Sequence, residues 1–315
     1  MNLLIMNIKK PKFWDYKKPN IYAYILYPFT ILIKIIVFLK KKFSLKNRKV
    51  KIKTICIGNI YIGGTGKTSL SLKINEILRQ KKINSCFVKK FYKEQSDEQR
   101  LLKDKGELFL SSKRIRAITE AEKQGYQIAI CDDGLQDSSV DYDIKVVCFN
   151  TINWIGNGMT LPSGPLRESI QNLKLYEHVF LNGNLENIEN LKKQILSINS
   201  KINIYLGKYE PINLFEFSKD ENYLVFSGIG NHQTFISMIK NNRLKIIKDL
   251  EFPDHYQYTQ NDINQILENA NKLNCQIITT EKDFYRLKNI KYEKIKYLKS
   301  ELKIINEEKI INLIL

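Results

Sequence analysis

The sequence predicts an α/β protein with a P-loop NTPase-type parallel sheet domain, a second, smaller α/β domain and an N-terminal membrane-associated helix. Short apolar runs alternate with polar helical stretches from Lys53 onward, which is the pattern of a parallel sheet covered by helices. A glycine-rich loop at residues 63–68 follows the first of these runs. Nearer the N-terminus, residues 21–39 form an apolar stretch between lysine-rich flanks. The predicted segments are 1–45, 46–200 and 201–315.

The composition bounds the class of protein. The chain has 315 residues, which favours one large or two moderate domains. A formal net charge of +18 suits nucleic acid, an anionic membrane surface or a phosphorylated substrate, and equally lysines scattered over the whole surface. None of the five cysteines forms a C-x-x-C pair and most lie in apolar runs, which indicates buried side chains in a reducing compartment. With only three histidines, the composition argues against a structural zinc site.

The apolar stretch at residues 21–39 contains one charge, Lys34, and one proline, Pro28. It is too long for a signal peptide and no small-x-small cleavage site follows it. A spanning helix is one interpretation, for which the length is marginal. A helix buried against the protein's own core is another. We favour an interfacial helix that begins at Pro28 and lies on the cytosolic face, with Lys34 extending to the headgroups.

The remaining elements follow from the apolar periodicity. The helix after the glycine-rich loop places Leu70, Ile74, Ile77 and Leu78 on one face. Later helices are predicted at 235–240 and 261–273. Strands are predicted at 54–58, 85–88, 127–131, 144–149, 178–181, 223–226 and 276–279. Because strands and helices resume after an Asn- and Lys-rich stretch at residues 185–220, we expect a second, smaller α/β unit there.

The glycine-rich loop is a candidate nucleotide site. It consists of Gly63, Gly64, Thr65, Gly66, Lys67 and Thr68. Backbone N–H groups of such a loop converge on phosphate oxygens at a helix N-terminus. Lys67 would reach the β- and γ-phosphates of a nucleoside triphosphate, and Thr68 would ligate Mg²⁺. Tyr61 replaces the first glycine of the G-x-x-x-x-G-K-[ST] pattern, so a glycine-rich turn without a ligand is the alternative. The preceding strand and following helix favour the nucleotide site.

Two further segments carry candidate residues for the same site. Asp132 and Asp133 end an apolar strand, where a magnesium ligand belongs in a P-loop protein, although an acidic strand-to-turn junction gives the same pattern. Residues 156–168 contain three glycines and two prolines and predict a shaped loop. Arg167 within this loop is placed to clamp a phosphate or an acidic partner, or the loop is purely structural.

The second half of the chain offers two weaker candidates. His255 follows Asp254 in a proline-led loop and suits a base or an orienting residue, but a surface histidine is the commoner case. Glu281 and Lys282 lie in the TTEKD run that closes a late strand. Ligands meet α/β units at strand ends, so these residues are candidates on the substrate side, or else a solvated charge cluster.

Several segments together resemble the tetraacyldisaccharide 4′-kinase family, the lipid A 4′-kinases. The segments are GNIYIGGTGKT, SDE at 96–98, DDGLQD, GNGMTLPSGPLRES, SGIGN, FPDH and TTEKD, within residues 58–283. The resemblance implies an ATP-dependent kinase that phosphorylates the 4′-hydroxyl of a tetraacyldisaccharide 1-phosphate to give lipid IVA. Its partners would be the lipid disaccharide and the cytosolic face of the inner membrane, with no nucleic acid.

The resemblance also implies roles for individual residues. Asp97 and His255 would form the catalytic dyad, with Asp97 accepting the proton of the sugar hydroxyl. Thr68 with the Asp132–Asp133 pair would hold Mg²⁺. The chain departs from the family at Leu135 and Asp137, where phenylalanine and histidine are usual, at Gln99, where proline is usual, and in a shortened stretch at 89–95.

Two other classes of protein compete with the lipid kinase. One is another P-loop protein. A GTPase-like switch needs a base-specifying N-K-x-D element, but Asn182-Gly183-Asn184 stands in its place. A soluble small-molecule kinase would have the same phosphate loop and stays open. A nucleic-acid-binding ATPase needs basic residues interleaved with aromatic residues on one face. The densest apolar and aromatic stretch is instead residues 21–39, which suits lipid. The oligomeric state is not predicted.

Overall fold

The chain folds into two compact units. The computed structural model describes residues 10–42, 49–91, 96–186, 188–254, 256–287 and 294–315. The first unit comprises Lys12–Asn182, Asn187–Gly207 and Ile304–Leu315. The second consists mainly of Lys208–Lys303 and also includes the short segment Gly183–Glu186.

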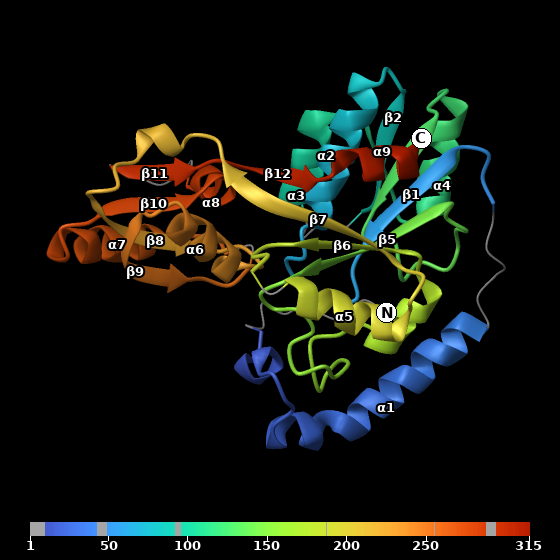
Figure 1. The fold of residues 1–315 in the computed structure, drawn as a ribbon, viewed down its shortest axis with the longest axis horizontal. Helices are drawn as coiled ribbons and strands as arrows, with labels where there is room; N and C mark the ends of the chain where they lie inside the picture. The colour runs from blue at the N-terminus through green and yellow to red at the C-terminus, as the bar shows by residue number, and fades with distance from the viewer. Residues whose placement is uncertain (1–9, 43–48, 92–95, 187, 255, 288–293) are drawn as a thin grey trace. The chain divides into compact units, whose positions relative to one another are not determined.

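An eight-stranded sheet forms the centre of the first unit, in the order β12-β7-β6-β5-β1-β4-β2-β3 (Figure 1). Every pairing from β7 to β3 is parallel, as the alternating pattern predicts. The carboxyl ends of these strands therefore meet at one edge, where the phosphate loop follows β1. The strands are β1 (Lys53–Gly58), β2 (Ser85–Lys90), β3 (Leu108–Ser111), β4 (Ile128–Asp132), β5 (Ile144–Asn150), β6 (His178–Asn182), β7 (Asn203–Pro211) and β12 (Ser300–Ile305).

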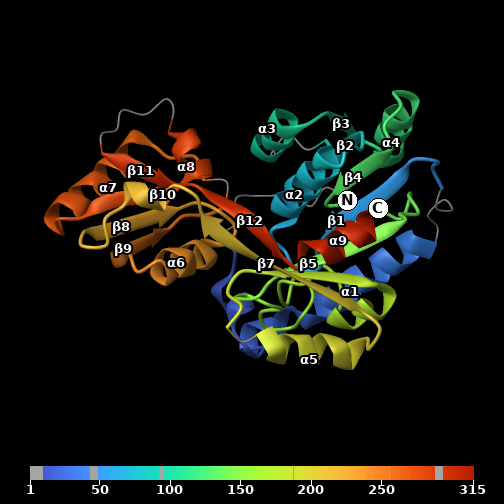
Figure 2. The same ribbon diagram turned by 45° about the horizontal axis from the view of Figure 1, so that its top comes forward.

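Helices cover both faces of the part of the sheet that carries the phosphate loop (Figure 2). Helix α2 (Lys67–Gln80) buries Leu70, Ile74, Ile77 and Leu78, the face predicted from the sequence. Helix α4 (Arg114–Lys123) packs its small apolar residues against the strand cysteines, and four of the five cysteines are buried. The remaining helices of this part are α3 (Ser96–Lys105), α5 (Ile188–Ile198) and the 3₁₀ helix η3 (Ile170–Leu175).

The N-terminal segment consists of the 3₁₀ helix η1 (Lys12–Asp15) and the long helix α1 (Ile21–Lys42). The Asn20 side chain accepts the Ala23 N–H at 3.1 Å, so the helix begins at residue 21. The prediction that Pro28 begins the helix is wrong, because this cap lies well upstream and Pro28 falls inside the helix. Most apolar side chains of α1 are exposed, and by length and composition the helix is able to cross a membrane.

The second unit is built on a four-stranded parallel sheet in the order β11-β10-β8-β9. Its predicted strands and helices are confirmed, and apolar side chains from both faces of the sheet are buried. The elements are η4 (Leu214–Glu216), β8 (Asn222–Ser227), α6 (His232–Asn241), β9 (Lys245–Glu251), α7 (Gln260–Lys272), β10 (Gln276–Thr280), α8 (Glu281–Arg286) and β11 (Ile295–Leu298).

The chain finally returns to the first unit. Helix α9 (Glu307–Ile314) follows β12 and buries Ile310 and Ile314. The Lys53 ammonium at the start of β1 donates to the Ile314 carbonyl at 2.9 Å. Residues 304–315 therefore pack against the strand that leads into the phosphate loop.

Candidate active site

The phosphate loop is held in shape by two buried asparagine amides. Asn59 Nδ2 donates to the Gly63 carbonyl at 3.2 Å and to Thr65 Oγ1 at 2.9 Å. Asn182 Nδ2, at the end of β6, donates to the Thr65 carbonyl at 2.7 Å. These bonds engage loop oxygens that would otherwise repel a phosphate group. Neither asparagine was predicted as a site residue, although Asn182 is a polar residue that ends a buried strand.

The glycines of the loop have a conformational role. Gly63 and Gly66 have φ values of 102° and 78°, in the region that favours glycine. Gly66 caps α2, so Lys67 and Thr68 occupy its first turn, where the helix dipole favours an anion. The predicted Gly63–Thr68 segment therefore combines two positive-φ glycines with the N-terminus of a helix.

Asp133 lies beside two cationic side chains. Arg167 Nη1 donates to Asp133 Oδ1 at 2.8 Å, and Lys67 Nζ lies 3.9 Å from the same oxygen. Burial alone would raise the pKa of the Asp133 carboxyl, but Lys67 and Arg167 outweigh burial and hold that pKa well below its usual range. Arg167 thus contacts an acidic partner within the site, one of the two roles predicted for it.

Asp132 lies in a different environment from its neighbour. Its carboxylate is fully buried, 2.6 Å from Lys89 Nζ, and accepts a 3.4 Å hydrogen bond from the Ser71 hydroxyl of α2. Lys89 Nζ is also 2.6 Å from Glu98 Oε2. Burial would lower the pKa of the Lys89 ammonium, but Asp132 and Glu98 outweigh burial and raise it above its usual value. The sequence predicted neither the burial of Lys89 nor this three-residue network.

A buried arginine shapes the turn that carries both aspartates. Arg114 Nη2 donates to the Asp132 carbonyl at 3.2 Å and to the Asp133 carbonyl at 3.0 Å. Its Nη1 donates to Asp137 Oδ2 at 2.8 Å. Asp137 thus has a structural partner of its own at one of the positions where the chain departs from the family pattern. Leu135 is another of these positions. Its side chain packs closely on Gly58, because a Cβ added to Gly58 would lie 2.7 Å from the Leu135 Cγ.

The loop at residues 156–168 joins the phosphate loop to the N-terminal segment. The Arg167 N–H donates to the Ile60 carbonyl at 2.7 Å, and the Ile62 N–H donates to the Pro165 carbonyl at 2.8 Å. On the other side, the buried Thr30 hydroxyl of α1 lies 2.8 Å from Ser163 Oγ. The loop is irregular, as predicted, and its position is set by contacts on both sides.

Tyr61, which replaces the first glycine of the phosphate-loop pattern, takes part in this junction. Its side chain is 2% exposed and its hydroxyl donates to Asp15 Oδ1 at 3.0 Å. Burial and the neighbouring carboxylate raise the pKa of Tyr61 well above its usual value, so the hydroxyl keeps its proton. A large side chain at this position therefore anchors the loop to η1.

In the second unit, Asp283 of the TTEKD run organises the turn after β8. This buried carboxylate accepts hydrogen bonds from the Gly228 N–H, the Tyr258 hydroxyl, the Thr280 hydroxyl and Arg286, at 2.6–3.0 Å. Glu281 lies 4.0 Å from Lys299, and Lys282 is exposed. Glu281 and Lys282, two of the three predicted substrate-side residues, thus directly precede a structural aspartate.

The predicted catalytic dyad lies partly outside the described residues. Asp97 falls in the first turn of α3, but its side chain lies outside what the structure describes, as does His255 as a whole. The described neighbours of His255 follow β9, where the Phe252 N–H donates to the Ser227 carbonyl at 2.9 Å.

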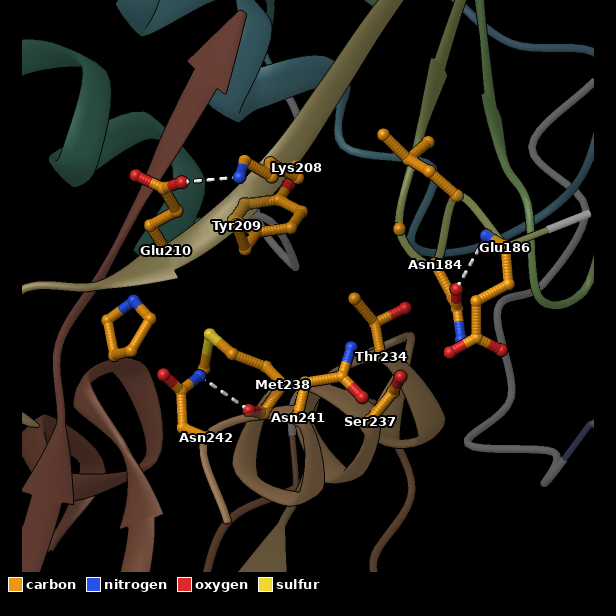
Figure 3. Close-up of a pocket in the computed structure, with 13 residues that line it drawn as sticks. Asn184, Glu186, Lys208, Tyr209, Glu210, Thr234, Ser237, Met238, Asn241 and Asn242 are labelled. Atoms are coloured by element: carbon orange, nitrogen blue, oxygen red, sulfur yellow. Dashed lines mark hydrogen bonds and ion pairs between the residues drawn. The ribbon is translucent and has the colours of Figure 1, made fainter. Parts of the chain in front are cut away.

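A cavity of about 510 Å³ opens in the second unit (Figure 3). Polar side chains from α6, including Thr234, Ser237 and Asn241, line it together with the Lys208–Glu210 ion pair, whose atoms are 2.7 Å apart. None of the residues that line it is among those predicted for catalysis or metal binding.

Comparison with known proteins identifies the family to which the chain is related. A family model described as tetraacyldisaccharide-1-P 4′-kinase matches residues 22–315. A tetraacyldisaccharide 4′-kinase of Pelagibacter ubique (strain HTCC1062) is 58% identical over 307 residues, covering 98% of this chain and 97% of the relative. A tetraacyldisaccharide 4′-kinase of Rickettsia bellii (strain OSU 85-389) is 32% identical, covering 88% of this chain and 89% of the relative.

A solved structure shares the fold. It is the "apo" form of LpxK from Aquifex aeolicus in complex with ATP, with a TM-score of 0.67 and 23% sequence identity, covering 93% of this chain and 98% of that one. The resemblance predicted from the sequence motifs is confirmed by the family model and by the close relative. The chain therefore belongs to the tetraacyldisaccharide-1-phosphate 4′-kinase family.

Proposed function

We propose that this protein transfers the terminal phosphoryl group of ATP to the 4′-hydroxyl of a tetraacyldisaccharide 1-phosphate, giving lipid IVA in lipid A biosynthesis. One observation carries the nucleotide half of the proposal. The phosphate loop has its oxygens engaged by Asn59 and Asn182, and Lys67 lies beside Asp133 and Arg167. A triphosphate bound to the loop thus meets backbone N–H groups, a helix N-terminus and two cations.

Mg²⁺ is the metal that this site would take. Thr68, Asp132 and Asp133 offer the hard oxygen atoms that Mg²⁺ prefers. The described part of the chain contains no group of three or more His, Cys, Asp or Glu residues able to hold a metal by itself. When bound, Mg²⁺ neutralises charge on the β- and γ-phosphates.

The acceptor half of the proposal assigns roles to Asp97 and His255. As the bond between the 4′-oxygen and the γ-phosphorus forms, the bond from that phosphorus to the bridging oxygen breaks and ADP leaves. The hydroxyl proton passes to the Asp97 carboxylate, and His255 orients or tunes that carboxylate. Lys67 stabilises the charge on the transferred group. We assign Arg167, Glu281 and Lys282 to the substrate side of the site.

We propose further that α1 binds the cytosolic face of the inner membrane. Its exposed side chains are largely Ile, Leu, Phe and Tyr, whereas its buried positions are the small residues Ala23 and Thr30. A helix that exposes its large apolar residues and packs through small ones is suited to lipid contact. The acceptor carries four acyl chains, so such contact brings the enzyme to where its substrate resides.

The assay combines purified protein, γ-labelled ATP with Mg²⁺, and tetraacyldisaccharide 1-phosphate in detergent micelles. We expect label to appear in the lipid with the wild type and not with Lys67→Ala. Lys73→Ala is the matched control, because Lys73 is also on α2 but pairs with Glu76 near the surface. Wild-type product formation by Lys67→Ala would rule out the proposed mechanism.

A further inference from the structure

The ammonium of Lys89 connects two parts of the site that are far apart in sequence. Lys89 lies at the carboxyl end of β2 and is 1% exposed. One of its contacts is Asp132 at the end of β4, and the other is Glu98 in the first turn of α3, each at 2.6 Å. The pairing of Val88 with Cys131 in adjacent parallel strands sets the first contact, because it places residues 89 and 132 next to each other.

The second contact restricts where α3 can begin. A buried ammonium needs its carboxylate partners, since an uncompensated buried charge is strongly destabilising. Glu98 is therefore held at Lys89, and Lys89 is held by Asp132. The helix is fixed again through Gln99 and Leu102, both buried. The backbone of the first turn of α3 is thus anchored to the end of β4 by charge and to the core by packing.

We propose that Lys89 and Glu98 form a positioning pair that fixes the first turn of α3, and with it residue 97, relative to Asp132 at the nucleotide site. The inference rests on the proposed role of Asp97 as the base. We assign both members a positioning role, because the Lys89 ammonium is buried and each contact described for it is a carboxylate of the protein. The pair sets the distance between Asp97 and the edge of the sheet that carries the phosphate loop. A displacement of about 1 Å in an active site can lower turnover about a hundredfold.

Glu98→Ala is the test variant, because Lys89 keeps Asp132 as a partner and the fold is expected to persist. Asp104→Ala is its matched control, since Asp104 is an exposed carboxylate on the same helix. We expect Glu98→Ala to lower kcat about tenfold to a hundredfold while the KM for ATP stays within about twofold. Amide hydrogen exchange in residues 96–105 should accelerate in the protein without ligands, and calorimetry should show unchanged binding of Mg²⁺–ATP. Asp104→Ala should match the wild type in all three.

A third variant, Asp97→Asn, separates this inference from the proposed function. If Glu98→Ala keeps wild-type kcat and exchange while Asp97→Asn is inactive, the positioning pair is refuted and the base assignment stands. Weakened Mg²⁺–ATP binding in Glu98→Ala with normal exchange also refutes it, because Glu98 then acts on the nucleotide. Wild-type turnover by Asp97→Asn refutes the base assignment, whatever Glu98→Ala does.

Discussion

The hydroxyl of Tyr61 donates a 3.0 Å hydrogen bond to the carboxylate of Asp15 and so ties the start of the phosphate loop to the segment that precedes α1. Trp14, next to Asp15, donates from Nε1 to the Pro162 carbonyl at 3.1 Å. The nucleotide loop, the 156–168 loop and the N-terminal segment are therefore joined by several direct hydrogen bonds. A glycine at position 61 would have no side chain with which to make the first of them.

Tyr61→Phe should loosen this junction while keeping the packed ring. Removal of one partly buried hydrogen bond to a carboxylate costs about 1–3 kcal/mol. We therefore expect a lower free energy of unfolding in urea and a KM for ATP raised by a few fold. Tyr16→Phe is the control, because Tyr16 is 50% exposed. Equal effects from both substitutions would contradict a specific role for the Tyr61 hydroxyl.

Arg167→Gln should change how stability depends on pH. The pKa of Asp133 is lower in the folded protein than in the unfolded chain, where it is about 3.9. This difference stabilises the fold at pH values above about 3.9, and the stabilisation is lost as the pH falls toward the pKa of the folded state. The substitution brings the folded pKa of Asp133 closer to the unfolded one. We expect a free energy of unfolding about 1–3 kcal/mol lower at pH 7, and a weaker fall between about pH 5 and pH 3.

Urea unfolding at a series of pH values measures this effect. The control is Arg116→Gln, which removes the same charge from an exposed position on α4. A parallel downward shift of the whole Arg167→Gln curve, with no change in slope below pH 5, would show that Asp133 is not the group involved.

Lysine at two exposed positions of α1 should separate membrane contact from catalysis. Ile25 and Leu32 are 62% and 56% exposed, so Ile25→Lys with Leu32→Lys disturbs neither Ala23 nor Thr30. We expect the double variant to lose binding to anionic vesicles in a flotation assay and to keep Mg²⁺–ATP binding. A pair of lysines at exposed α5 positions is the charge control, and vesicle binding retained by the α1 variant would place the anchor elsewhere.

Asp283→Asn should destabilise the second unit. The carboxylate is fully buried, and Arg286 and three neutral groups donate to it. Loss of its charge removes the buried ion pair with Arg286, which costs about 3–5 kcal/mol. Urea unfolding followed by hydrogen exchange in residues 222–287 measures the loss. Asp220→Asn, an exposed aspartate of the same unit, should change the free energy of unfolding by less than about 0.5 kcal/mol.

The parts of the fold predicted from sequence are those with local signals. The phosphate loop and the strands at its sides follow from glycine spacing and apolar runs, as does the position of Asp132 and Asp133 at a strand end. Strand β9 has alternating exposure and several charges, so its sequence lacks a continuous apolar run. The apolar run predicts the N-terminal helix, but a start at Pro28 is wrong because the Asn20 side chain caps the helix upstream of it.

The network around the site depends on partners that are distant in the chain. Lys89 occurs in a basic run that resembles a surface segment, and its burial depends on Asp132, 43 residues away, together with Glu98. Arg114 lies in a polar helix, and its role follows from carbonyl oxygens 18 and 19 residues further on. Such contacts arise from the order of strands in the sheet, which local patterns do not determine.

The packing of residues 304–315 into the first unit has a consequence for biosynthesis. The strand that leads into the phosphate loop is made early, whereas the segment that packs against its beginning through Lys53 is made only after the whole second unit. During translation the nucleotide-binding unit therefore remains incomplete at one edge while the second unit emerges from the ribosome. The packing of Ile310 and Ile314 and the contact with Lys53 are expected to form only when synthesis has passed β12.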